Sequence, residues 1–460
     1  MSDFSFSERM KARAIKPVIK KVLADPERNI PRALDWVERL DWKQSLQSQI
    51  NQVRRAMNQK SNWYDLAMST VHDLDEDQVT KLFINFVING NIIANKRSEA
   101  VRERYDCNVP WAILMDPTSA CNLKCIGCWA ADYGHNMQMT LEELDDIIEQ
   151  GKEMGVFVYL YTGGEPLIRK KDIITLCEKH DDCVFSSFTN GTLIDEAFCK
   201  EMKRVGNFVP AVSVEGFEEA TDSRRGKGTF KKICRAMELM REYKLAFGLS
   251  CCYTSANYRD IGSEKYFDWM VEQGAKFAWF FTYMPVGVNA TTDLMVTPEQ
   301  RAFMYDRIRS FRHSKPIFTV DFWNDGEYVN GCIAGGRCYL HINANGDVEP
   351  CAFIHYSDSN IREVGLLEAL QRPLFKAYKE GQPFSHNLLR PCPLLDNKDR
   401  LAEMVEASGA KSTDLEHPED VRSLCAKCHC AADMWRPKAD ELWAEGHWEA
   451  CNPRGFKKRA

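Results

Sequence analysis

Short apolar segments alternate with amphipathic helical segments between about residues 111 and 283, and this alternation constrains the fold of the 460-residue chain most. Strands that are each followed by a helix form parallel sheets, because the helix carries the chain back over one face of the sheet. Six such units predict an α/β fold with a partial (βα)6 TIM-like barrel. The expected strands are Trp111–Asp116, Val156–Thr162, Val184–Thr189, Phe208–Glu215, Ala246–Tyr253 and Phe277–Tyr283, and the expected helices begin near Thr140, Lys170, Asp195, Thr229 and Ser263.

Three cysteines, Cys121, Cys125 and Cys128, directly follow the first expected strand. Their CxxxCxxC spacing lets three thiolates converge from one short loop, and cysteine thiolates are the usual ligands of a 4Fe–4S cluster. Three ligands leave one iron open to bind a small molecule. A structural zinc site would need a fourth ligand, and the nearest candidate, His135, fits zinc spacing poorly. The loop therefore predicts a cluster at the carboxyl ends of the strands, where ligands bind in such folds.

Small and polar residues follow the next three expected strands. Gly163-Gly164-Glu165-Pro166 comes after the second strand, and its glycines would let a ligand approach the backbone closely. Asn190 follows the third strand and offers an amide, while Ser213 and Glu215 at the fourth offer a hydroxyl and a carboxylate suited to ribose or an amino group. Each signal alone is ordinary turn chemistry. Their occurrence at successive strand ends favours a ligand site.

These motifs resemble those of the radical S-adenosylmethionine (radical SAM) superfamily over about residues 108–290. In that family the three cysteines hold the SAM-binding 4Fe–4S cluster. The resemblance implies that Gly163, Gly164 and Glu165 contact the methionine amino group, and that Asn190, Ser213 and Glu215 contact the ribose and carboxylate of SAM. One departure is Gly127, since the residue before the third cysteine is usually aromatic in the family, whereas here Trp129 follows that cysteine.

The carboxyl-terminal region resembles the SPASM extension of peptide-modifying radical SAM enzymes. Gly346 precedes Cys351 by the characteristic five residues. The resemblance implies one auxiliary 4Fe–4S cluster without an open iron. Sulfatase-maturing relatives carry a catalytic carboxylate directly after the residue equivalent to Cys351, whereas this chain has Ala352, which argues against a copied serine- or cysteine-oxidising mechanism. The implied auxiliary ligands are Cys332, Cys338, Cys351 and Cys392.

A second cysteine group follows in the order CxxCxC, with His429 inside it. It suits a second cluster, a zinc ion or free thiols on a helix. The candidate ligands are Cys425, Cys428, Cys430 and Cys451.

The first 107 residues read as helical, with an apolar segment at 82–93 that is expected to be buried or to line an apolar substrate channel. Residues 1–60 hold 13 Lys and Arg against 7 Asp and Glu in a chain of net charge −6, so a peripheral contact with an anionic membrane surface is one expectation.

No apolar run is long enough to span a bilayer, no signal pattern starts the chain and nothing indicates nucleic-acid binding. A cytoplasmic protein is expected. The predicted domains are 1–107 (helical), 108–296 (barrel), 297–330 (linker) and 331–460 (iron–sulfur extension).

The favoured function is a radical SAM enzyme of oxidoreductase or lyase type. By the resemblance, it cleaves SAM reductively to a 5′-deoxyadenosyl radical, which abstracts hydrogen from an unactivated C–H bond. The expected substrate is a peptide or a lipid-like molecule, and the electron donor a reductase, flavodoxin or ferredoxin. The alternative is a non-catalytic iron–sulfur or zinc scaffold or electron carrier on the same fold, although a carrier has no use for an open iron or a ligand cradle.

Overall fold

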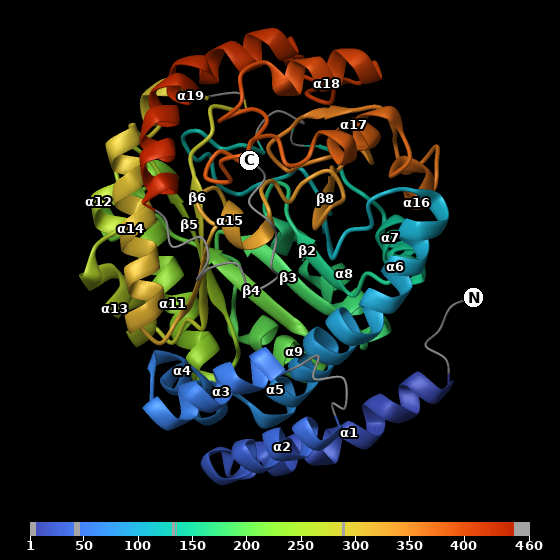
Figure 1. The fold of residues 1–460 in the computed structure, drawn as a ribbon, viewed down its shortest axis with the longest axis vertical. Coiled ribbons are helices and arrows are strands. Elements are labelled where there is room, and N and C mark those ends of the chain that lie inside the picture. Colours follow the sequence, from blue (N-terminus) through green and yellow to red (C-terminus); the bar gives the residue numbers. More distant parts are fainter. Residues whose placement is uncertain (1–5, 41–46, 131–133, 135, 288–289, 446–460) are drawn as a thin grey trace.

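One nine-stranded sheet forms the centre of the computed structural model, which describes residues 6–40, 47–130, 134, 136–287 and 290–445 (Figure 1). Its strand order is β7-β6-β5-β4-β3-β2-β1-β8-β9, and every neighbouring pair is parallel except β8 and β9. The strands are β1 Ala112–Met115, β2 Val158–Tyr161, β3 Val184–Thr189, β4 Phe208–Ser213, β5 Gly248–Tyr253, β6 Phe277–Thr282, β7 Phe318–Asp321, β8 Tyr339–Ile342 and β9 Val348–Glu349; β10 Tyr356–Ser357 and β11 Lys411–Ser412 form a separate antiparallel pair.

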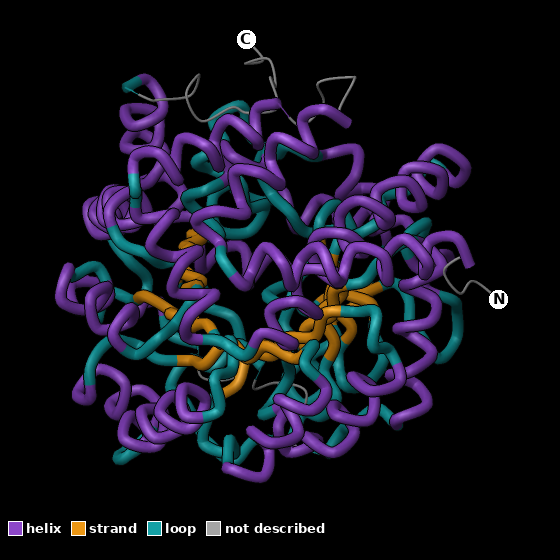
Figure 2. Tube along the Cα trace, turned by 90° about the horizontal axis from the view of Figure 1, so that it is seen from below, coloured by secondary structure: helices purple, strands orange, loops and turns teal. Residues whose placement is uncertain are grey.

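The six expected strands are β1 to β6, so the prediction of an α/β fold with a parallel sheet is confirmed. Seen from below, the strands lie in the interior and helices surround them (Figure 2). The sheet differs from the expectation at one end, because β8 from the carboxyl-terminal extension pairs with β1 in parallel register. The extension is therefore joined to the barrel sheet by backbone hydrogen bonds.

The five predicted helices between the strands start where the sequence predicts, and polar side chains satisfy the first free N–H groups of three of them. Thr140 and Glu143 form a capping box, and Asp195 and Ser263 accept N–H donors in the same way. The helices between β1 and β7 are α7 Leu141–Met154, η3 Pro166–Arg169, α8 Lys170–Lys179, α9 Glu196–Val205, α10 Glu218–Arg225, α11 Thr229–Glu242, α12 Tyr258–Ile261, α13 Glu264–Glu272, η4 Thr292–Leu294 and α14 Pro298–Ser314.

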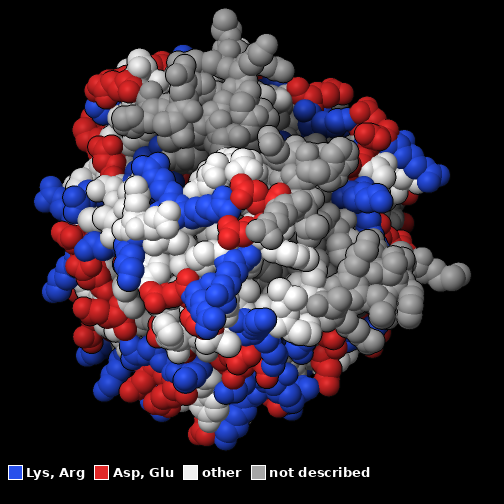
Figure 3. Space-filling view, turned by 60° about the horizontal axis from the view of Figure 1, so that its bottom comes forward, with Lys and Arg blue, Asp and Glu red and all other residues white. Residues whose placement is uncertain are grey.

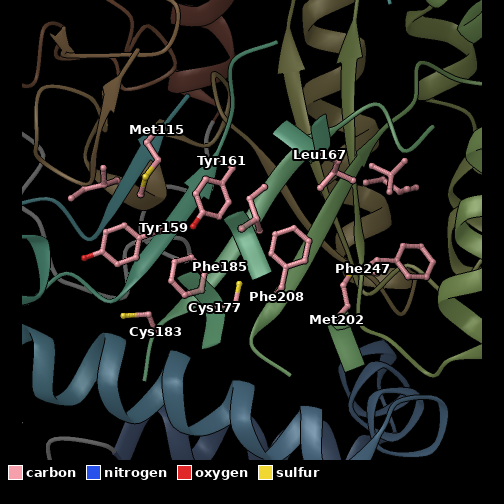
Figure 4. Packing of buried hydrophobic residues seen from close by; sticks show 14 of the residues in the cluster. Met115, Tyr159, Tyr161, Leu167, Cys177, Cys183, Phe185, Met202, Phe208 and Phe247 are labelled. Carbon is pink, nitrogen blue, oxygen red and sulfur yellow. The ribbon is translucent and has the colours of Figure 1, made fainter. Parts of the chain in front are cut away.

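A large apolar core lies between the sheet and these helices. Tyr161 and Phe185 stack with ring centroids 5.9 Å apart on neighbouring strands, and Cys177 and Cys183 lie beside them (Figure 4). These two thiols, with Cys199 and Cys251, are fully buried. They therefore act as small apolar side chains.

The amino-terminal helices lie under the amino-terminal ends of the strands (Figure 1, blue). Gln78 accepts a hydrogen bond from the backbone N–H of Ala246 at 2.8 Å, and Lys81 donates one to the carbonyl of Val205 at 2.7 Å. These contacts fix the helices as the floor of the barrel. Their bounds are α1 Phe6–Ala24, α2 Pro26–Leu40, α3 Gln47–Gln59, α4 Asn62–Asp73, α5 Glu76–Phe83, η1 Ile84–Ile93 and α6 Ala94–Tyr105.

The apolar segment at 82–93, expected to be buried or to line an apolar channel, is only partly buried, and Leu82, Phe83 and Phe86 line the central cavity. It forms a π-helix, η1, in which the polar Asn85 and Asn89 face the barrel and donate to the carbonyls of Cys183 and Asp182 at 2.8 and 2.9 Å. Phe86 and Ile92 are instead 44% and 61% exposed. The wider π-helical turn moves the two amides onto the inner face, so the apolar residues point partly to solvent.

The carboxyl-terminal helices lie on the opposite side, above the carboxyl ends of the strands (Figure 1, orange and red). They are α15 Gly326–Val329, α16 Leu366–Ala369, α17 Pro373–Gly381, α18 Arg400–Ser408 and α19 Val421–Ala444. No helix in the described ranges is long and apolar enough to cross a membrane. The division into four predicted domains stays a prediction.

A buried histidine connects the barrel to the extension. His341 in β8 contacts Asp116, just after β1, at 2.8 Å through Nε2 and Glu349 in β9 at 2.6 Å through Nδ1, and all three side chains are fully buried. Burial by itself lowers the pKa of His341, but the two carboxylates outweigh it and raise the pKa from 6.5 to about 10. The imidazole is therefore protonated at neutral pH and lies buried between two carboxyl groups.

Replacing His341 with Ala should lower the free energy of unfolding by about 3–5 kcal/mol, because two buried carboxylates lose their counter-charge. Urea unfolding under anaerobic conditions measures this. The exposed His313→Ala variant is the matched control and should change little. Since the folded pKa of His341 is raised, its contribution is complete below pH 6.5 and is lost as pH rises towards about 10. Unchanged wild-type stability over that range would contradict the charged pair.

Candidate functional site

The three cysteines that follow β1 lie at the carboxyl ends of the strands and line a cavity of about 700 Å³. The loop is held to its surroundings by backbone hydrogen bonds, including Ser119 N–H to the carbonyl of Met137 at 2.9 Å. Cys121, Cys125 and Cys128 are each half-buried and are free thiols. The thiols therefore face a shared space.

The predicted SAM contacts and the predicted auxiliary-cluster ligands all lie in the walls of the same cavity. They come from the ends of β2, β3 and β4 and from the extension, which approaches from above. Their roles as ligands stay a prediction. They are Gly163, Gly164, Glu165, Asn190, Ser213, Glu215, Cys332, Cys338, Cys351 and Cys392.

The two glycines after β2 allow the chain to approach itself. A Cβ at Gly164 would lie 2.2 Å from the carbonyl oxygen of Ala120, and one at Gly163 would lie 2.5 Å from that of Thr118. Gly163 also has φ +98°, which strains other residues. The Gly164 N–H donates to the Thr118 carbonyl at 3.0 Å, so the motif packs directly on the cysteine loop.

Glu165 and Asn190 hold neighbouring strand ends together. The Glu165 carboxylate accepts from the Thr189 hydroxyl at 2.6 Å, from the Asn190 N–H at 2.7 Å and from the Leu167 N–H at 3.0 Å. Burial raises the pKa of Glu165, and these donors oppose the rise. The Asn190 side chain donates to Asn122 in the cysteine loop at 2.8 Å. In this arrangement both side chains organise the cavity wall.

Two arginines that sequence reasoning did not select hold Glu215. Arg224 donates to Glu215 at 2.8 Å and also to the carbonyls of Ile126 and Gly127, both at 3.2 Å. Arg225 donates to the same carboxylate at 2.6 Å. Burial would raise the pKa of Glu215, but the two guanidinium groups keep it below its usual value. The adjacent arginines before Gly226, shortly after a strand-end glutamate, are the signal available in the sequence.

The thiols of the loop fit an anionic metal cluster. The Leu123 N–H donates to Cys121 Sγ at 3.4 Å, and Arg225 Nη1 lies 4.0 Å from Cys125 Sγ. Burial raises the pKa of Cys121 to about 11 and also raises that of Cys125, where Arg225 opposes the rise. These buried thiols become thiolates when a metal binds them, and the arginines supply positive charge beside them.

Tyr283 occupies the space left by Gly127, the position that departs from the family pattern. A Cβ at Gly127 would lie 2.7 Å from the Tyr283 ring, which comes from the end of β6. Trp129 instead packs against His341 and Phe353, with centroids 5.9 and 5.5 Å apart. The aromatic residue in contact with the loop beside the third cysteine therefore comes from a distant strand.

The four extension cysteines that line the cavity come from separate segments. Tyr339 contacts Cys351 Sγ at 2.8 Å, and the Leu395 N–H donates to Cys392 Sγ at 3.3 Å. Gly346 has φ +86° in the turn before Cys351. Hydrogen bonds to sulfur stabilise thiolates that bind a metal. The four extension cysteines therefore also fit a metal cluster.

Among the three alternatives for the second cysteine group, its described members fit free thiols on a helix. All three of its described members lie on the continuous helix α19, where Cys425 and Cys428 share one face and Cys430 lies on another. Cys425 and Cys428 are buried in an apolar cluster, whereas Cys430 is exposed. His429 contacts Asp399 at 3.2 Å. Cys451, like His135, lies outside the described residues.

Comparisons with known proteins agree with this arrangement. The Radical SAM superfamily matches residues 115–261. Fe-coproporphyrin III synthase of Methanosarcina barkeri is 32% identical over 47% of this chain and 57% of its own length. A Cysteine-type anaerobic sulfatase-maturating enzyme of Clostridium perfringens is 30% identical over 53% of this chain and 75% of its own. The chain thus spans little more than half the length of the first of these relatives.

Among solved structures, Streptococcus suis SuiB bound to S-adenosylmethionine has a TM-score of 0.52 and 17% identity, covering 59% of this chain and 68% of that one. At this identity the likeness concerns the fold alone.

Replacing Gly164 with Ala should disrupt the cysteine loop, because the new Cβ would meet the Ala120 carbonyl at 2.2 Å. We expect a loss of stability of about 1–3 kcal/mol or more and a marked loss of iron and sulfide bound after reconstitution. Gly365→Ala is the control, since its Cβ meets only a flexible Gln150 side chain at 3.3 Å. Equal iron content in both variants would contradict the role of Gly164.

Proposed function

This chain belongs to the radical SAM superfamily, and we propose that it is an enzyme whose Cys121, Cys125 and Cys128 hold a 4Fe–4S cluster that binds SAM. When bound, the reduced cluster supplies an electron that cleaves SAM to methionine and a 5′-deoxyadenosyl radical, which takes a hydrogen atom from a C–H bond of the substrate. The observation that carries the proposal is that the cysteine loop and the three predicted strand-end motifs line one cavity.

The residues of this chain position the reactants and exclude water. Gly163 and Gly164 leave room beside the loop, and Glu165 fixes the ends of β2 and β3. Ser213 and Glu215, which line the cavity, would contact the ribose and carboxylate of SAM. Apolar side chains make up most of the remaining wall. A radical formed there would meet few groups other than its substrate.

The auxiliary set, Cys332, Cys338, Cys351 and Cys392, would hold a second 4Fe–4S cluster. Because these four cysteines supply all four ligands, the auxiliary cluster would have no open iron. It would therefore conduct electrons and bind no substrate. A reductase, flavodoxin or ferredoxin would deliver the electron in the cytoplasm. The group at Cys425 and Cys428 is left out of this proposal, because Cys430 lies on another side of α19.

Two substrate classes follow from the chain and its relatives. A peptide is favoured by SuiB, which was solved bound to the precursor peptide SuiA, and by the relative from C. perfringens, which matures sulfatases by name. A lipid-like substrate is favoured by the apolar cavity. Ala352 lines the cavity directly after Cys351 and carries no carboxylate, which argues against serine or cysteine oxidation. A non-catalytic scaffold would not need the strand-end motifs.

The Cys125→Ala variant should form no 5′-deoxyadenosine above background, because the loop loses one of three thiolates. The assay uses protein purified and reconstituted without oxygen, reduced with dithionite and supplied with SAM; liquid chromatography quantifies the product. Cys234→Ala, which lies outside the cavity on α11, is the control and should keep wild-type activity. Equal activity in the two variants would refute the assignment of the site.

The Cys392→Ala variant should keep the SAM-cleaving activity and lose product formation, since it removes a ligand of the auxiliary cluster alone. Iron content and the spectrum of the reduced protein by electron paramagnetic resonance should show one cluster fewer than the wild type. Retention of all bound iron would contradict an auxiliary cluster at this position.

A further inference from the structure

The inward-facing side chains of the barrel strands are apolar along most of their length. Residues alternate on a strand, so every second side chain faces the interior. On β2 these are Val158 and Leu160, and on β6 they are Phe277, Trp279 and Phe281. The other apolar strand residues that line the cavity are Ala112, Leu114, Val184, Phe188, Val209 and Phe318.

The cavity passes through the whole barrel. It is lined at one end by the cysteine loop and at the other by the floor helices α4, α5 and η1, where Leu74, Val79 and Leu82 face it. From Val158, near the floor, to Gly163, at the cysteine loop, the strand advances roughly 17 Å at about 3.3 Å per residue. The apolar space is therefore long and directed at the cysteines.

Three phenylalanines mark an opening at the floor. Phe83, Phe86 and Phe318 all line the cavity, yet they are 44%, 44% and 46% exposed. Side chains that are in contact with both a cavity and solvent lie at its mouth. Trp111 packs edge-on against Phe86 and Trp63 lies against Phe318. Figure 3 brings this end of the molecule forward and shows uncharged surface between charged side chains of both signs.

Few polar groups face the lower part of the cavity. Lys276 is held at the floor by Asp73 at 2.8 Å and Ser69 at 3.0 Å, and the Ser186 hydroxyl has no hydrogen-bond partner among the described residues. An extended peptide would bring an N–H and a carbonyl with every residue, and unpaired groups of this kind are costly to bury. A hydrocarbon chain brings none.

We propose that the lower part of the cavity binds a long, unbranched hydrocarbon chain, the acyl or alkyl chain of a lipid-like substrate, that enters between Phe83, Phe86 and Phe318. The inference rests on the proposed function, because the chain points towards the SAM-binding loop. With single bonds of about 1.5 Å, a channel of this length holds about a dozen methylene groups.

Competition binding tests the channel without turnover. Reconstituted protein with SAM is saturated with the fluorescent probe dansylundecanoic acid, and straight-chain fatty acids from hexanoic to hexadecanoic acid displace it. Affinity should rise about fourfold per added methylene and level off near a dozen carbons, when the channel is full. No binding, or equal affinity at all lengths, would overturn the proposal.

Variants locate the bound chain. Val184→Phe narrows the floor end and should make the affinity level off at shorter fatty acids. Phe83→Asn makes the mouth of the cavity polar and should weaken the binding of long fatty acids several-fold. Because Phe83 is half exposed, this variant is expected to fold even if Val184→Phe does not, and it then provides the test. Ile92→Asn is its matched control, exposed on the adjoining helix η1 and outside the cavity. If Phe83→Asn binds long fatty acids as tightly as the wild type does, the proposed entrance between the three phenylalanines is wrong.

The two proposals fail separately. Deoxyadenosine formed from SAM by a protein that binds no fatty acid would overturn the hydrocarbon channel and support the radical enzyme. Chain-length-dependent binding by a protein that never cleaves SAM would overturn the proposed function and support the channel.

Discussion

A buried imidazole between two carboxylates sets the position of the cysteine loop relative to the extension cysteines that line the cavity. Asp116 begins the loop that carries Cys121, Cys125 and Cys128, while Glu349 lies two residues before Cys351, and His341 contacts both. Thr162, after β2, donates to the same Asp116 carboxylate at 2.6 Å. The same small network therefore connects the first two strand ends, the cysteine loop and the hairpin of the extension. Any movement of the cysteine loop relative to the extension cysteines would pull His341 away from Asp116 or Glu349.

The polar residues at the strand ends are held by the protein itself before any ligand arrives. Glu165 is bound by three donors, and Glu215 by two arginines, of which Arg224 also donates to carbonyls of the cysteine loop. A wall fixed in this way needs little rearrangement when a ligand binds. Gly163 and Gly164 show the same principle, because their missing side chains admit the backbone of the loop.

The sequence predicts the strands, the helix starts and the set of residues that meet at the cavity, because these depend on local patterns. Thr140 and Glu143 form the capping box that their spacing indicates. Long-range pairings carry no such signal: β8 is a four-residue strand containing a histidine, and only its position beside β1 makes it part of the sheet. Arg224 and Arg225 look like an ordinary charged helix end, and their role depends on Glu215 being brought close. The inward turn of Asn85 and Asn89 likewise depends on a π-helix that apolar periodicity does not reveal.

The pairing of β8 with β1 also protects an edge. Without it, the outer side of β1 would present unpaired N–H and carbonyl groups, which invite strands of other molecules to add to the sheet. In the complete chain the last strand on this side is β9, which is two residues long and therefore offers little to pair with. A shortened chain that ended before Cys332 would keep every barrel strand and the SAM motifs, and would nonetheless be prone to self-association. The carboxyl-terminal extension thus contributes to the solubility of the barrel as well as to the wall of its cavity.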